Sequence, residues 1–225
     1  MSVLGSNGPN SFVWWSWVGD HLAEIRDRTT EHLELTAIAL GVGFVLSGVL
    51  AAIALRFRRT YAPIVGVAGF LYTIPSLALF GFLVPITGFT TTTAEIGLVS
   101  YTLLILIRNI VAGVDGVPAD VKEAADGMGY TRARRFFTVE LRLATPAIVA
   151  GLRIAAVTTI GLVTVSSLIG QGGYGRLIKD GLDRDFSTPL VVGATLSVAM
   201  AIVFDLALVV VERRLTPWVR RREIR

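Results

Sequence analysis

The chain has 225 residues, of which 53% are apolar and only 17% charged, and its mean hydropathy is +0.66. A soluble domain carries charge at about a quarter of its positions, so this composition excludes an ordinary soluble domain and indicates an all-α polytopic membrane protein. The absence of cysteine excludes disulfides and thiolate chemistry. Only His21 and His32 supply imidazole, and without a third well-spaced ligand we expect no metal site.

The amino-terminal segment, residues 1–33, is predicted to lie outside the cytoplasm. From Phe12 to Leu33, apolar residues recur at helical spacing opposite acidic ones. This pattern predicts an amphipathic helix at the outer membrane interface, anchored by Trp14, Trp15 and Trp17.

The first two predicted spans follow directly. Leu35 to Leu55 is free of charge and ends before three arginines. The uncharged run from Thr60 to Ala94 is too long for one straight crossing and too short for two. We therefore expect one crossing over Ala62–Pro85, kinked at Pro75 and broken at Pro85, and then an outer threonine-rich loop over Thr87–Thr93.

Three further spans complete the predicted membrane domain, residues 34–212. They cover Ile96–Val114, Pro146–Leu168 and Thr188–Val211. The polar stretch over residues 115–145 is then the principal cytoplasmic loop, and residues 213–225 are a basic cytoplasmic tail. About five transmembrane helices result, with the amino terminus outside and the carboxyl terminus inside.

The distribution of basic residues agrees with this orientation. Only five of the 21 lysines and arginines fall on the predicted outer side, namely Arg26, Arg28, Arg176, Lys179 and Arg184. An excess of basic residues is typical of cytoplasmic loops. The location of the basic residues, which produce the net charge of +4, therefore indicates a multi-pass protein of the cell membrane in contact with lipid. It does not indicate a protein that binds nucleic acid.

The predicted cytoplasmic loop contains two short amphipathic helices. Val121–Met128 is predicted to form a helix that Gly129 stops, and a second helix is predicted from Thr131. The second should present Phe136 and Phe137 on one face and Arg132 and Arg135 on another. Such a pair suits docking to a cytosolic partner; the alternative is a loop packed on its own membrane domain.

The same loop carries a family resemblance. Glu123-Ala124-Ala125 followed by Gly129 resembles the EAA loop of ABC importer permeases, and the similarity continues to Gly151-Leu152-Arg153. Ile74–Leu79, Arg108-Asn109 and Ile169–Gly175 resemble the branch that imports osmoprotectants such as glycine betaine, choline and carnitine. Arg142 departs from the family, which commonly has proline there.

The resemblance implies the partners and the mechanism. It implies a second permease subunit, identical or different, two cytosolic ATPase subunits and an extracytoplasmic substrate-binding protein. Glu123, Ala124, Ala125 and Gly129 would couple the chain to the ATPase. This chain contains no phosphate-binding loop, so it needs no cofactor of its own and is not the enzyme; ATP and magnesium would bind to the separate ATPase.

Ionisable and polar residues within the spans give further candidates. Arg108, Arg153 and Asp205 all lie about 9 to 10 Å from the predicted inner boundary, counted at 1.5 Å per helical residue. Because lone charges there are costly, we expect a charge layer in which Asp205 pairs with Arg153, or else with Arg108. Candidate substrate-path residues are Tyr72, Pro75, Ser76 and Asn109, and aromatic rings at Tyr72, Phe80, Phe82 and Tyr101 could face a quaternary ammonium group.

The sequence leaves the function open between several classes. An osmoprotectant importer permease is the principal interpretation, and a methionine-type or other amino-acid importer permease is the alternative within transport. A passive channel or a membrane-embedded enzyme would be a different class. The sequence selects neither the solute nor a homodimer over a heterodimer.

Overall fold

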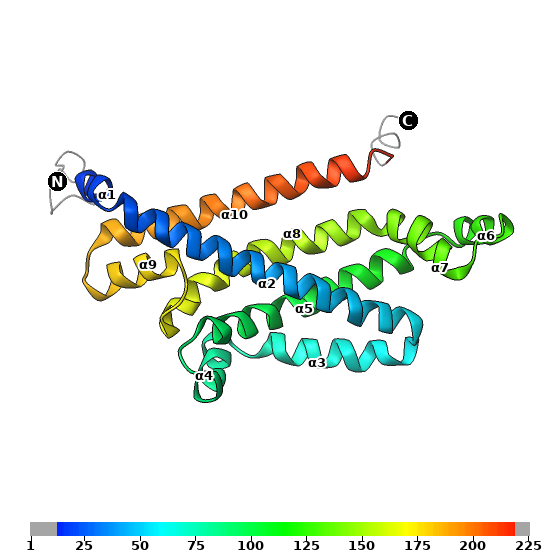
Figure 1. The fold of residues 1–225 in the computed structure, drawn as a ribbon, viewed down its shortest axis with the longest axis horizontal. Coiled ribbons are helices and arrows are strands. Elements are labelled where there is room, and N and C mark those ends of the chain that lie inside the picture. The colour runs from blue at the N-terminus through cyan, green and yellow to red at the C-terminus, as the bar shows by residue number, and fades with distance from the viewer. Residues whose placement is uncertain (1–12, 219–225) are drawn as a thin grey trace. The chain divides into compact units, whose positions relative to one another are not determined.

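The protein is described here by a computed structural model that places residues 13–218. Within these residues every regular element is a helix (Figure 1). The elements are α1 (Trp15–Asp20), α2 (Leu22–Arg56), η1 (Arg58–Thr60), α3 (Tyr61–Thr73), α4 (Ser76–Thr87), α5 (Thr91–Asp115), α6 (Ala119–Gly127), α7 (Arg132–Arg135), η2 (Phe136–Glu140), α8 (Leu141–Val165), η3 (Ser166–Ile169), α9 (Tyr174–Asp183) and α10 (Ser187–Leu215).

The number of membrane spans agrees with the sequence. Four helical stretches are long and apolar enough to cross a membrane, and a fifth span results if α3 and α4 are counted as one broken span. The four are α2, α5, the continuous run Arg132–Ile169 and α10. The prediction of an all-α protein with about five spans is confirmed.

The predicted amino-terminal helix is divided differently from our expectation. Instead of one amphipathic helix over 12–33, of which residue 12 lies outside the described residues, the short helix α1 ends at Asp20. The next helix, α2, begins at Leu22 and continues without interruption into the first span, so one helix joins the amphipathic part to the apolar part.

The second predicted span is divided differently from our expectation. The helix breaks at Pro75, whose backbone is extended (φ −55°, ψ 134°). Pro85, predicted to end the crossing, instead lies inside α4. That helix ends at Thr87, and the following Gly88 stops it with a positive φ of 74°, which glycine adopts without steric cost. The predicted threonine-rich loop is shorter than expected, since α5 begins at Thr91.

The described residues divide into two compact units, and α2, α5, α8 and α10 each contribute segments to both. Unit 1 comprises Met1–Gly41, Ile74–Val99 and Val157–Val203. Its core is an apolar cluster in which α2, α4, α5, α8 and η3 meet, and Phe80 is its largest member at 1% exposure. Gly97 allows that ring to approach, because a Cβ atom there would lie 2.5 Å from Phe80 Cε1.

Unit 2 comprises Val42–Thr73, Ser100–Ala156 and Phe204–Arg225. Its apolar core joins α2, α3 and α5. Small residues bring its helices close together: a Cβ atom on Gly113 of α5 would lie 3.1 Å from the Cβ of Ala144 of α8. Close approach at small residues is the ordinary way in which membrane helices associate without a hydrophobic driving force.

The glycine-rich segment before α9 forms a tight turn. Gly170, Gly172 and Gly173 all have positive φ values of 82°, 122° and 49°. A Cβ atom on Gly172 would lie 2.5 Å from the backbone nitrogen of Ser167. The turn therefore needs glycine both for its backbone conformation and for its space.

Candidate functional site

The segment between α5 and α8 contains a helical hairpin at one end of unit 2 (Figure 1). We call residues 119–140 the α6–η2 hairpin. Its helix α6 follows Pro118, whose extended backbone (φ −56°, ψ 145°) precedes the first helical residue. At its other end Gly129 is left-handed (φ 78°), and the N–H of Gly129 donates to the carbonyl of Asp126 at 2.9 Å. The predicted helix with a stop at Gly129 is confirmed, with bounds shifted by one or two residues.

The second predicted helix also forms, but as part of a longer helical stretch. Thr131 caps α7, since its hydroxyl accepts a hydrogen bond from the backbone N–H of Arg134 at 3.3 Å. The chain then continues through the π-helical turn η2 directly into α8. The hairpin is therefore in direct helical continuity with a membrane span.

The residues of the EAA motif differ in exposure. Glu123, Ala124 and Gly129 are exposed, whereas Ala125 is buried at 1% exposure. Ala125 therefore packs inside the hairpin, and its carbonyl accepts a hydrogen bond from the N–H of Tyr130 at 3.1 Å. Among the described residues of the motif, those open to a partner are Glu123, Ala124 and Gly129.

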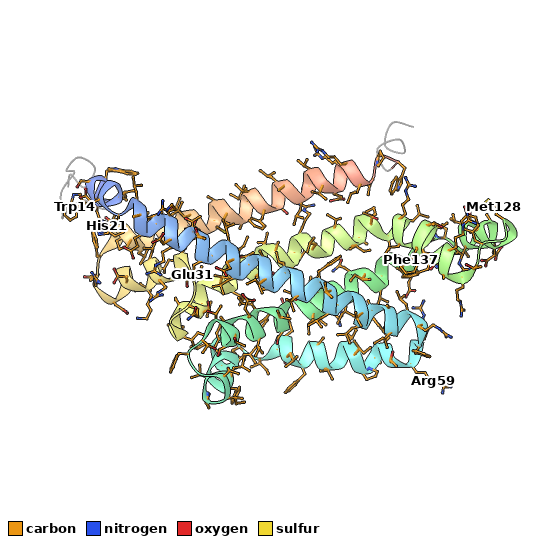
Figure 2. All side chains as sticks on the ribbon, viewed as in Figure 1. Trp14, His21, Glu31, Arg59, Met128 and Phe137 are labelled. Atoms are coloured by element: carbon orange, nitrogen blue, oxygen red, sulfur yellow. The ribbon has the colours of Figure 1, made fainter. Side chains whose placement is uncertain are left out.

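Two large apolar side chains of the hairpin are exposed. Met128 is 66% exposed and Phe137 is 67% exposed (Figure 2). Met128 is not among the residues that the sequence motifs predict, although a large apolar residue between Gly127 and Gly129 in a polar loop is a signal for it. The predicted opposition of both phenylalanines to the arginines is wrong, because Phe136 lines the same cavity as Arg132 and Arg135.

Arg135 joins the two arms of the hairpin. Its Nη1 forms an ion pair with Asp126 of α6, and its Nε donates to Oε1 of Glu140 at 2.7 Å. Glu140 is only 8% exposed, so this contact satisfies a carboxylate that would otherwise be buried without a partner. The structure therefore makes Arg135 an internal brace of the hairpin.

One contact attaches the hairpin to the end of α5. Lys122 donates from its ammonium group to the carbonyl of Val114 at 3.3 Å. The same end of α5 is held to η1, because Arg58 forms a bidentate pair with Asp115 at 2.8 and 2.7 Å, although the residues are 57 positions apart.

A basic cavity of about 600 Å³ lies beside the hairpin. Five basic side chains line it with one carboxylate, and the remaining lining is apolar. Arg56 and Arg132 form no ion pair with any residue in the range 13–218, so they keep their charge uncompensated. This side of the hairpin therefore presents positive potential to an approaching molecule.

Within unit 2, Arg153 of α8 binds Asp205 of α10. The guanidinium donates to both carboxylate oxygens, at 2.8 and 3.1 Å, and lies 3.6 Å from Glu212. A bidentate arginine–carboxylate pair is among the stronger ionic hydrogen-bonding arrangements. The sequence placed Arg153 and Asp205 at one depth, and the structure brings their charged groups into contact.

Arg108 does not join this pair. Its side chain is exposed, and among residues 13–218 it forms no ion pair. The predicted charge layer therefore lacks Arg108. The observed cluster consists of Arg153, Asp205 and the carboxylate of Glu212. Sequence spacing gives the depth of a residue along a helix, but the direction of its side chain around the axis depends on packing.

The residue that departs from the family pattern, Arg142, causes no break. It lies in the first turn of α8, and its guanidinium stacks over the ring of Trp218 at 5.2 Å from the centroid. Pro146 follows inside the same helix. The unusual residue is therefore accommodated by a cation–π contact with the carboxyl-terminal segment.

The candidate substrate-path residues fall into both units. In unit 2, Tyr72 meets Tyr101 edge to face, with ring centroids 5.7 Å apart. Asn109 donates to the carbonyl of Ile105 at 2.8 Å and packs against Gly151, where a Cβ atom would lie 2.4 Å from Asn109 Cβ. Asn109 therefore has a packing role in this arrangement.

The other path candidates lie in unit 1. Pro75 is exposed at the start of α4, and Ser76 is half-buried beside it. Of the two phenylalanines considered for cation–π contacts, Phe80 is a core residue, whereas Phe82 is 67% exposed. The core position of Phe80 makes its ring unavailable to a solute in this arrangement.

Comparison with known proteins identifies similar sequences over most of the chain. Residues 44–217 match the family described as "binding-protein-dependent transport system inner membrane component". The choline transport system permease protein OpuBB of Bacillus subtilis is 35% identical over 194 residues, which cover 86% of this chain and 89% of the relative. The osmoprotectant import permease protein OsmW of Salmonella typhimurium is 33% identical over 203 residues, covering 88% and 94%.

The fold is also similar to that of solved transporters. A structure of the MetNI methionine ABC transporter in an inward-facing conformation matches with a TM-score of 0.75 at 20% identity, covering 88% of this chain and 98% of the matched chain. At that identity the likeness shows a shared fold and carries no information on the solute.

Proposed function

Because this chain belongs to the family of binding-protein-dependent transport system inner membrane components, being the permease subunit of an ABC importer, we propose that it imports quaternary ammonium osmoprotectants across the cell membrane. The observation that carries the choice of solute is the set of relatives at 33% and 35% identity, whose names specify osmoprotectants and choline. The methionine-type alternative is supported by the fold alone.

We propose that the α6–η2 hairpin couples the chain to a cytosolic ATPase. Glu123 and Ala124 offer a small, polar, exposed face, and Met128 beside them offers an apolar contact. Arg135 braces the hairpin, so a push on α6 moves α7 as well. Since η2 continues into α8, that movement is passed to a membrane span, and this is the coupling that alternating access needs.

The complete importer in this proposal contains two permease subunits, two ATPase subunits and an extracytoplasmic binding protein. ATP and magnesium bind to the ATPases, and this chain supplies the membrane path and the docking hairpins. The amino terminus lies outside and the carboxyl terminus inside, as the basic residues favour. Tyr72, which is 38% exposed, is the proposed aromatic contact on the path, and the buried ring of Tyr101 packs against it.

The solute is tested by uptake into proteoliposomes that contain the purified complex and its binding protein. Glycine betaine, carnitine and choline are compared with methionine, each with and without ATP inside. ATP-dependent uptake of at least one quaternary ammonium compound, and none of methionine, is expected. Uptake of methionine alone would replace the proposed solute, and equal uptake without ATP would indicate a channel.

The coupling role is tested by charge reversal on the hairpin. Glu123→Arg should abolish uptake and substrate-stimulated ATP hydrolysis while the permease still reaches the membrane, because only the docking face changes. Arg59→Glu is the matched control, since Arg59 is exposed and lies outside the hairpin (Figure 2). Normal uptake by Glu123→Arg, or equal loss in the control, would contradict the proposed role.

A further inference from the structure

A second cavity lies in unit 1, at the end of the unit that carries Trp14 and His21 (Figure 2). Its volume is about 310 Å³, and its walls come from α1, the start of α2, α9 and the turn before α10. Small-molecule sites commonly begin at about this size. Neither the EAA motif nor the candidate path residues contribute to it.

One wall of this cavity is an aromatic corner. The rings of Trp17 and Phe186 stand at 89° to each other with centroids 5.8 Å apart. His21 stacks on Trp17 at 4.1 Å, and its Nδ1 donates to the carbonyl of Trp17 at 2.8 Å, so both rings are held in place. Electron-rich faces meeting at a right angle suit a cation that presents methyl groups in several directions.

Most of the charged side chains that line the cavity are paired. One carboxylate and one guanidinium are not closely paired. Asp180 pairs with Arg184 at 2.7 Å, and Arg28 pairs with Glu31 at 3.2 Å. Glu24 has only a contact of 3.8 Å with Arg28. Arg176 forms no ion pair with any residue of the described range 13–218. The cavity therefore offers a nearly free carboxylate and a free guanidinium to one ligand.

Arg28 contributes a second guanidinium to the cavity wall. Its side chain is 24% exposed and is paired with Glu31, so it reaches the cavity as an ion-paired cation. A carboxylate is the acceptor that a guanidinium binds best.

The walls are tied to one another by contacts between distant parts of the chain. The backbone N–H of Trp14 donates to the hydroxyl of Thr188 at 2.9 Å. The hydroxyls of Tyr174 and Thr29 lie 2.9 Å apart, which joins α9 to α2. Contacts within the chain therefore hold the aromatic corner, and such preorganisation lowers the cost of binding.

We propose that this cavity is a binding site for a zwitterionic quaternary ammonium compound on the permease itself. The trimethylammonium group lies in the corner of Trp17 and Phe186 with Glu24 as its counter-charge, and the ligand carboxylate meets the guanidinium of Arg176. This inference rests on the proposed function, whose solute class it narrows: compounds with a carboxylate, such as glycine betaine and carnitine, bind here more tightly than choline, which lacks one.

The test measures equilibrium binding of radiolabelled glycine betaine and choline to the purified permease–ATPase complex without its binding protein. Trp17→Leu should weaken binding of both ligands about tenfold, because one cation–π face is lost. Trp15→Leu is its matched control, since Trp15 lies on the same short helix, is 65% exposed and does not line the cavity.

A second pair of variants separates the two ends of the ligand. Arg176→Gln should weaken binding of glycine betaine and leave that of choline unchanged, and Arg26→Gln, an exposed arginine outside the cavity, should change neither. Absence of saturable binding, equal effects in the Trp15 control, or equal effects of Arg176→Gln on both ligands would overturn the proposal. Those results would leave ATP-driven uptake intact, whereas failure of the proposed function would appear as no uptake of any quaternary ammonium compound.

Discussion

The backbone N–H of Tyr174 donates to Nδ1 of His32 at 3.3 Å, across 142 positions of the sequence. Because Nδ1 accepts, the ring proton is assigned to Nε2, which donates to the carbonyl of Ile160 at 3.2 Å. His32 is completely buried, and Glu31 beside it accepts a hydrogen bond from the N–H of Gly172 at 3.0 Å. One turn of α2 therefore holds the glycine-rich turn and α9 in place.

Replacing this histidine should loosen the turn. His32→Leu strands the N–H of Tyr174, and we expect the permease to lose about 1–3 kcal/mol of stability, the usual cost of a buried group without a partner. Thermal unfolding of the purified complex measures the loss. Leu33→Ala, a change at the exposed neighbour, should have a much smaller effect; similar melting of both variants would refute the role of His32.

Glycine at position 175 is required by space. A Cβ atom there would lie 2.1 Å from the carbonyl oxygen of Thr164, which is backbone and cannot move aside. Gly175→Ala should therefore greatly reduce the yield of folded permease. Gly161→Ala is the matched control, because nothing lies within 4 Å of its added Cβ atom. Comparable yields from the two variants in size-exclusion chromatography would contradict this close approach.

The pair of Arg153 and Asp205 can be tested by a double-mutant cycle on folded yield and uptake. Asp205→Asn leaves Glu212 as a second acceptor for Arg153, whereas Arg153→Gln leaves two carboxylates without their cation. We therefore expect Arg153→Gln to be the more harmful single change, and the second change to be partly compensating. Arg108→Gln combined with Asp205→Asn should be additive; additivity in the Arg153 cycle would exclude the pair.

Loss of the brace within the α6–η2 hairpin should make α6 mobile. Arg135→Gln removes the cation that Asp126 and Glu140 share, so amide hydrogen exchange in residues 119–130 should become faster. Arg132→Gln, which removes an exposed arginine of α7 that forms no ion pair among residues 13–218, should leave the exchange of α6 unchanged. Unchanged exchange in Arg135→Gln would show that packing alone holds the hairpin.

The orientation of the chain can be tested by labelling, since the protein contains no cysteine of its own. A cysteine at the exposed position Ser16 should react with an impermeant thiol reagent in intact cells. One at the exposed position Thr138 should react only after the membrane is opened. The reverse pattern would invert the predicted topology.

The sequence predicted those structural features that depend on one residue and its immediate neighbours. The stop at Gly129 follows from the backbone conformation that glycine allows. The interruption of the second span follows from proline, although the break lies at Pro75, where we expected a kink, and not at Pro85. Pairing of Arg153 with Asp205 was predictable because helical rise fixes depth.

Contacts between distant residues could not be predicted in the same way. Arg58 and Asp115 are both charged residues at helix ends, and nothing in their spacing of 57 positions indicates that they meet. The aromatic corner of Trp17 and Phe186 likewise depends on α1 lying beside the turn before α10. The tryptophans are interpreted as membrane anchors from sequence because an isolated helix gives no sign of what its other face meets.

The π-helical turn η2 has a geometric consequence for the hairpin. Arg135 and Glu140 are five positions apart, and on a regular α-helix residues at that separation point about 140° away from each other. In the wider turn over Phe136–Glu140 each ring closes over one more residue, which brings both side chains to the same side. The one extra residue of the π-helical turn therefore determines how the hairpin is rotated about the axis of α8. Its removal would rotate the preceding part of the hairpin by about 100° relative to α8. The direction in which Glu123 faces therefore depends on the number of residues in η2, which begins thirteen positions further along the chain.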